Sequence, residues 1–156
     1  MTSPERPPIA GVVAPPPLIF GAPLVTGLLL DRWHPLPFLP PTIATWIGIP
    51  LFLGLFVGFP AVIAFRRAAT SPNPWRPSTA LVTDGIYGVT RNPMYLGMLL
   101  LYLGGSCWGN SLWPLCFLPL VLGVMHVGVI VREEAYLESQ FGEEYRSYRK
   151  RVRRWL

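Results

Sequence analysis

Long uncharged runs dominate the pattern of hydrophobic and polar positions along the chain. No Asp, Glu, Lys or Arg lies between Trp33 and Phe65, and none lies between Asn92 and Val131. Each of these runs exceeds the roughly 20 residues that a helix needs to cross the hydrocarbon core of a bilayer. The pattern therefore predicts membrane-spanning helices.

These two runs contain three predicted spans, and residues 12–30 form a further candidate ahead of them. The clearest span is residues 43–65, and Arg66 and Arg67 follow its last residue. The second uncharged run holds two helices, because the glycines and small polar residues of "GGSCWGNS" at 104–111 suit a short turn. The first candidate contains four prolines, which spanning helices tolerate when neighbouring helices satisfy the backbone. The predicted spans are residues 12–30, 43–65, 93–108 and 112–131.

The segment after the last span, residues 132–155, has the pattern of an amphipathic helix. Its apolar residues from Leu137 to Trp155 recur at steps of three and four, and the cations Arg146, Arg149, Lys150 and Arg153 lie elsewhere around the helix. Such a helix can lie on an anionic membrane surface or fold back over a site beneath it, and Gly142 can allow a bend. The predicted fold is thus all-α: a single domain, 1–156, forming a polytopic membrane helix bundle of about four transmembrane helices plus a C-terminal amphipathic cytosolic helix.

Composition and charge agree with a membrane protein. Hydrophobic residues make up 51% of the chain and charged residues only 13%, where soluble domains have about a quarter. With four spans and a cytosolic N-terminus, Arg32 is the only Lys or Arg on the outer side, as the positive-inside rule expects. We therefore expect an integral protein of the bacterial inner (plasma) membrane with both termini cytoplasmic. Cys107 and Cys116 both lie at membrane depth, and neither a disulfide nor a metal site is expected from them.

A first candidate site is the stretch "GIYGVTRNPMYLG" at 85–97. Pro93 suits the first position of a helix, and Asn92 is then a favoured cap. The free N–H groups of that helix start, together with Arg91, would attract a carboxylate or a phosphate. The alternative is structural: Arg91 as a topology anchor, Asn92 as a plain cap, and Tyr87 and Tyr95 as interfacial residues.

A second candidate site follows the last span. Arg132, Glu133 and Glu134 emerge directly from the membrane, where two adjacent carboxylates are costly unless paired. The two glutamates either pair with a neighbouring arginine or bind the hydroxyls or the amine of a ligand. His126 lies seven residues before Glu133, so an unbroken helix places both on about the same face. A packing or hydrogen-bonding role for His126 is the alternative.

Together, "GIYGVTRNPMYLG" and "REEAYLESQFGEEYRSYRKRV" resemble the isoprenylcysteine carboxyl methyltransferase and phospholipid methyltransferase superfamily of integral membrane enzymes. The resemblance covers roughly residues 80–153 and lies in both motifs, in order and one helical hairpin apart. It implies S-adenosylmethionine as the methyl donor, a lipophilic small-molecule or lipidated substrate, and contact with membrane lipid. Neither a nucleic acid partner nor a metal is expected, and the oligomeric state is left open.

The resemblance and the residue pattern together give the predicted site. The predicted catalytic residues are Arg132, Glu133 and Glu134. The predicted cofactor-binding residues are Tyr87, Arg91, Asn92, Pro93, Tyr95, Gly97, His126, Glu133 and Glu134. Of all these, the resemblance itself implies Arg91, Asn92, Pro93, Tyr95, Gly97 and the two glutamates. Carboxyl methyltransferases of this kind usually read Arg-His-Pro, and Asn92 replaces that histidine here.

The sequence therefore predicts a methyltransferase similar to the isoprenylcysteine carboxyl methyltransferases, acting on a membrane-embedded lipid or lipidated acceptor. A carboxylate acceptor would require a cation, and an amine acceptor would require a base. The alternatives are a phospholipid N-methyltransferase or a membrane reductase related to sterol reductases. A non-catalytic scaffold would leave the paired glutamates unexplained.

Overall fold

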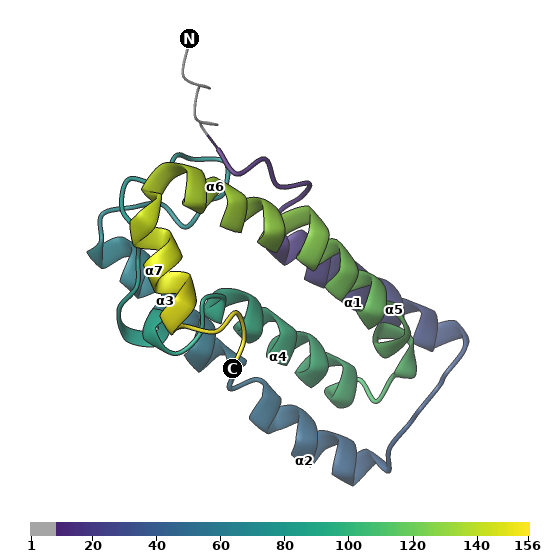
Figure 1. Cartoon of the computed structure of the whole chain (residues 1–156). Coiled ribbons are helices and arrows are strands. Elements are labelled where there is room, and N and C mark those ends of the chain that lie inside the picture. Colours follow the sequence, from purple (N-terminus) through teal and green to yellow (C-terminus); the bar gives the residue numbers. More distant parts are fainter. Residues whose placement is uncertain (1–8) are drawn as a thin grey trace.

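The computed structural model describes residues 9–156, apart from the side chain of Pro50, and this part of the chain is helical with no strands. The all-α prediction is confirmed for these residues. Figure 1 shows the end of α3, the start of α4 and both α6 and α7 gathered at one end of an elongated bundle. The elements are α1 (Pro16–Trp33), α2 (Pro41–Leu51), α3 (Gly54–Arg67), the short η1 (Gly85–Gly88), α4 (Pro93–Trp108), α5 (Leu112–Met125), the π-helical η2 (His126–Ile130), α6 (Val131–Phe141) and α7 (Glu143–Arg151).

Helix α4 is the central element, with α2 and α3 packed along one side and α1 along another. Glycines allow the close approach of α2 and α3. A Cβ atom on Gly97 would lie 2.8 Å from the Gly54 carbonyl oxygen, and one on Gly48 would lie 3.0 Å from the Trp108 nitrogen. Small residues at helix contacts are the usual means of close packing within a membrane, because the lipid supplies no hydrophobic driving force between helices.

The prediction of four spans is supported only in part. Within residues 9–156, two helical stretches could cross a membrane by length and composition, Pro41–Arg67 and Leu112–Phe141. The first contains the predicted span 43–65, although it divides into α2 and α3 near Phe52. Large apolar side chains face outward along both stretches, including Trp46, Phe56 and Leu120. A membrane protein is therefore supported, and the number of crossings stays a prediction.

The last span continues without a break into the charged segment, but its helical register changes on the way. The π turn η2 accommodates one extra residue, which rotates everything after it by about 100° relative to an unbroken α-helix. The Gly128 carbonyl in this turn accepts a hydrogen bond of 3.1 Å from the Val13 amide. The register change therefore decides which residues of α6 face the interior of the bundle.

The predicted helix 132–155 is two helices followed by an extended tail. Gly142 has φ +55° and ψ −121°, a conformation that an L side chain rarely adopts, and it separates α6 from α7. Helix α7 ends at Arg151, and Val152 is extended. The predicted bend at Gly142 is therefore confirmed, whereas the prediction of helix through Trp155 is wrong. The bend turns α7 and the tail back toward the start of α4 (Figure 1).

Candidate active site

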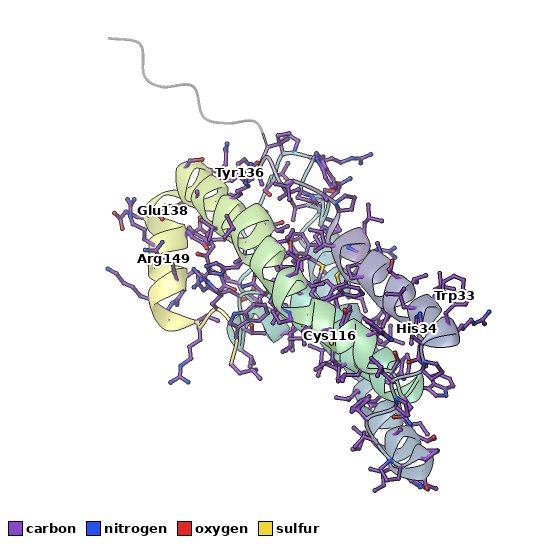
Figure 2. All side chains as sticks on the ribbon, turned by 90° about the vertical axis from the view of Figure 1, so that its right-hand side faces the viewer. Trp33, His34, Cys116, Tyr136, Glu138 and Arg149 are labelled. Carbon is purple, nitrogen blue, oxygen red and sulfur yellow. The ribbon has the colours of Figure 1, made fainter. Side chains whose placement is uncertain are left out.

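A cavity lies at the end of the bundle where α4 starts and α6 ends. Figure 2 shows Tyr136, Glu138 and Arg149 at this end of the molecule, with Trp33 and His34 at the other. The loop after α3 covers the cavity, and its Ser78 amide donates a 2.9 Å hydrogen bond to the Tyr136 hydroxyl. The free space is about 100 Å³, whereas ligand pockets usually measure about 300–1,000 Å³. A larger ligand therefore needs more room than this cavity offers.

The first motif contributes one wall of the cavity, and it is held by the C-terminal tail. The Arg91 amide donates to the Arg153 carbonyl at 3.0 Å. The Thr90 hydroxyl and the Asn92 side-chain amide both donate to the Arg154 carbonyl, at 3.1 and 3.0 Å. The Asn92 side chain therefore does not cap α4, as the sequence had suggested, because its amide binds the tail instead.

Glu134 is the centre of a charged cluster at the cavity wall. Its carboxylate lies 3.0 Å from Arg91 Nη1 and receives two hydrogen bonds from Arg154, at 2.9 Å from Nε and 2.7 Å from Nη2. Arg91 Nη1 also donates to the Tyr145 hydroxyl at 3.2 Å. The Glu134 side chain is only 14% exposed, so both arginines satisfy a carboxylate that water largely cannot reach.

Glu133 has different surroundings, although it is adjacent in sequence. The Tyr95 hydroxyl lies 2.7 Å from both of its carboxylate oxygens, and no arginine or lysine of residues 9–156 forms an ion pair with it. Burial raises the pKa of Glu133 to about 7, with a smaller opposing effect from the Tyr95 hydrogen bond and a further increase from the Glu134 charge. Glu133 can therefore exchange a proton near neutral pH, and it lies just beyond the predicted span.

Tyrosines form much of the remaining wall. Tyr87, Tyr136, Tyr145 and Tyr148 all line the cavity and are buried. The Tyr148 hydroxyl donates to the Tyr87 carbonyl at 2.8 Å, which joins α7 to η1. Burial raises the pKa of Tyr87, Tyr145 and Tyr148, so these phenols stay neutral at physiological pH. This wall of the cavity is therefore aromatic and uncharged.

Six of the residues predicted to form the site line this one cavity. They come from η1, from the start of α4 and from α6, which are distant in sequence. They are Tyr87, Arg91, Asn92, Tyr95, Glu133 and Glu134.

The other four predicted site residues do not line the cavity. Pro93 is fully buried at the first position of α4, and Gly97 packs against the backbone of α3. His126 is exposed, because the π turn removes the shared face with Glu133 that an unbroken helix would give. Arg132 is also exposed, and its guanidinium donates to the Gly11 carbonyl at 2.8 Å. The structure thus gives none of these four a position beside a ligand in the cavity.

Several residues of the site were missed by the sequence reasoning. Arg76, Tyr136, Tyr145 and Tyr148 line the cavity, and Arg154 holds Glu134. Tyr145 and Tyr148 were assigned only to the apolar face of a helix, and their three-residue spacing does place them on one face of α7. Tyr136 lies on α6, before the bend at Gly142, and was given no role. Arg154 lies among several similar cations, so its position in the sequence carries no signal. Within residues 9–156, no three His, Cys, Asp or Glu side chains are grouped to hold a metal ion.

Comparison with known proteins identifies relatives of this chain. The chain is 52% identical over 64 residues to an uncharacterized protein of Haemophilus influenzae, covering 40% of this chain and all of that protein. It is 47% identical over 73 residues to the protein-S-isoprenylcysteine O-methyltransferase of Schizosaccharomyces pombe, covering 46% of this chain and 30% of the relative. It is 32% identical over 109 residues to the cobalt-zinc-cadmium resistance protein CzcN of Cupriavidus metallidurans, covering 69% of this chain and 50% of the relative.

The chain therefore spans half or less of the two relatives with descriptive names. No solved structure matches it. The family model for phospholipid methyltransferases matches residues 43–144, which include the first motif, the paired glutamates and the helices between them. The resemblance seen in the two motifs is thus confirmed: the chain belongs to the phospholipid methyltransferase family, within the superfamily that also holds the isoprenylcysteine carboxyl methyltransferases.

Proposed function

We propose that this chain is an S-adenosylmethionine-dependent methyltransferase whose acceptor is a lipid or a lipidated molecule in the membrane. The observation that carries the proposal is the meeting of the two motifs at one cavity. Arg91 and Asn92 at the start of α4 face the same space as Glu133 and Glu134 of α6. Membership of a methyltransferase family supports the reaction class, and it gives no support to the reductase alternative.

The residues of the cavity fit the chemical groups of S-adenosylmethionine. Arg91 Nε is buried and has no hydrogen-bond partner among the described residues. The first-turn N–H groups of α4 lack intrahelical acceptors, and the Asn92 side chain does not cap them. These donors suit the carboxylate of the methionine moiety. The Glu133 carboxylate suits its ammonium or the ribose hydroxyls, and the tyrosine faces suit the adenine.

Bound in this cavity, S-adenosylmethionine would supply a methyl group activated by its attachment to a sulfonium. The protein must then align donor and acceptor and exclude water. The apolar wall formed by Phe65, Met94 and Leu137 contributes to the exclusion of water. Because transfer requires only positioning, no further catalytic group is needed for an acceptor that is already ionised.

The acceptor follows from the relatives and from the charges at the cavity. The S. pombe relative favours a carboxyl acceptor, such as the carboxyl group of an isoprenylcysteine. Arg76 lines the cavity, and its side chain forms no ion pair among the described residues, so it can orient a carboxylate. The family model favours the amine of a phospholipid as the second acceptor. In that case Glu133, with its pKa of about 7, can accept the proton that the amine releases.

Binding and transfer experiments test the proposal. Calorimetric titration of the detergent-purified protein should show saturable binding of S-adenosylmethionine and none of NADPH. Labelled methyl donor should then transfer its label to a prenylcysteine or to a phospholipid amine. Glu133→Gln and Glu134→Gln should weaken binding or turnover by at least about tenfold, the equivalent of one charge-assisted hydrogen bond.

The matched control is Glu143→Gln. This carboxylate is 79% exposed and pairs only with Arg146 on the surface of α7, so its loss should leave binding and turnover unchanged. If all three variants matched the wild type in binding and turnover, the proposed site would be wrong.

A further inference from the structure

The C-terminal tail is seated against the start of α4. Its carbonyl groups accept three hydrogen bonds from Thr90, Arg91 and Asn92, at 3.0 to 3.1 Å. Trp155 packs against the hydrophobic core. The tail is therefore fixed by its backbone and by one large side chain.

Arg154 adds a contact that serves the cavity itself. Its guanidinium binds both oxygens of Glu134, and Glu134 also contacts Arg91. The forked, two-bond geometry is the arrangement in which an arginine recognises a carboxylate most strongly. Arg153, its neighbour, is exposed, and its side chain forms no hydrogen bond or ion pair within residues 9–156.

The charges of this cluster do not balance. Glu134 carries one negative charge, and Arg91 and Arg154 carry one positive charge each, so the cluster has a net charge of +1. Because Arg154 already neutralises Glu134, the charge of Arg91 remains available for an anionic group in the cavity. Without Arg154, Arg91 and Glu134 would form a neutral pair that attracts an anion far less.

We propose that Arg154 is a positioning residue: by binding Glu134 it leaves the charge of Arg91 for the carboxylate of the methyl donor. This inference rests on the proposed function. It makes the C-terminal tail part of the site, although the tail does not line the cavity.

Titration of full-length variants with S-adenosylmethionine tests the inference. Arg154→Gln should weaken binding by about tenfold, the equivalent of one charge-assisted hydrogen bond. Arg154→Lys should recover part of the loss, because an ammonium keeps the charge but not the fork. Arg153→Gln, with the same change of charge one residue away, should bind like the wild type. Thermal unfolding of each variant checks that the fold is kept.

A double-variant cycle separates this role from simple support of the fold. In a Glu134→Gln background no negative charge needs to be neutralised, so adding Arg154→Gln should cause little further loss of affinity. A loss from Arg154→Gln that is as large in the Glu134→Gln background as in the wild-type background would overturn the inference, as would wild-type affinity in Arg154→Gln.

Amide hydrogen exchange distinguishes failure of the inference from failure of the proposed function. The Arg91 amide donates to the tail, so its exchange should become faster in Arg154→Gln and not in Arg153→Gln. If the wild type binds no S-adenosylmethionine, the proposed function is wrong, and faster exchange would still support the link between Arg154 and the start of α4. Unchanged exchange would overturn that link.

Discussion

Removing the Tyr95 hydroxyl isolates its contribution as a hydrogen-bond donor to the Glu133 carboxylate. Tyr95 is buried, and its hydroxyl lies 2.7 Å from both carboxylate oxygens. In Tyr95→Phe the ring keeps its packing, and only the donor is lost. A donor stabilises the ionised form of a carboxyl group, so the substitution should raise the pKa of Glu133.

The size of the effect follows from the strength of such a bond. Hydrogen bonds to charged groups contribute about 1.5–3 kcal/mol, which corresponds to about one to two pH units in a titration midpoint. The pKa of Glu133 is already raised from 4.5 to about 7, mainly by burial. Glu133 in Tyr95→Phe should therefore remain protonated well above neutral pH.

The raised pKa of Glu133 also makes the free energy of unfolding depend on pH. Between pH 4.5 and about 7 the folded protein holds a proton on Glu133 that the unfolded chain has released. The free energy of unfolding therefore decreases as the pH rises through this window, and it is steady with respect to Glu133 above it. In Tyr95→Phe the window should extend to higher pH.

Infrared spectroscopy can follow the protonated carboxyl group directly. The band of Glu133 is the one that disappears in Glu133→Gln, and its titration midpoint should be higher in Tyr95→Phe than in the wild type. Tyr102→Phe is the matched control, because that hydroxyl lies on the same helix and donates to the Pro114 carbonyl. A midpoint in Tyr95→Phe equal to or below that of the wild type would refute the assignment of this bond.

Three further predictions follow from the fold. Gly97→Ala should lower the stability by about 1–3 kcal/mol through overpacking against α3, measured by thermal unfolding, whereas Gly58→Ala, which meets no neighbour, should not. In a cysteine-free background, Pro77→Cys and Ser147→Cys should be labelled from the same side of the membrane by an impermeant thiol reagent, and labelling from opposite sides would contradict the topology. Glu138→Gln should change stability by less than about 1 kcal/mol, because its ion pairs are on the surface (Figure 2).

Local features of the sequence were enough to predict most of the helices. The predicted bounds of 93–108 are those of α4, because Pro93 starts that helix and the small residues near 109–111 form the turn that ends it. The bend at Gly142 was likewise readable, because only glycine adopts its φ readily. Hydrophobic runs, prolines and glycines act within a few residues, so a single sequence contains this information.

The two motifs that meet at the cavity were also readable from the sequence, through the resemblance to a family. The sequence did not show which individual side chains face the cavity. One extra residue in the π turn is enough to turn His126 to the outside while Glu133 faces inward. The Asn92 side chain looked like a helix cap, yet it binds a carbonyl 62 residues away.

Only the tertiary structure showed that the two adjacent glutamates have different surroundings. In sequence they are equivalent, but Glu133 has one tyrosine as its partner and Glu134 has two arginines. Arg154 is one of the two arginines in the tail, and of these two only Arg154 reaches Glu134, 20 residues away. The sequence by itself thus determined where helices form and which motifs belong together, because those depend on short-range patterns. The protonation and pairing of each carboxylate depend on charges and donors brought together from distant segments, and only the folded chain sets them.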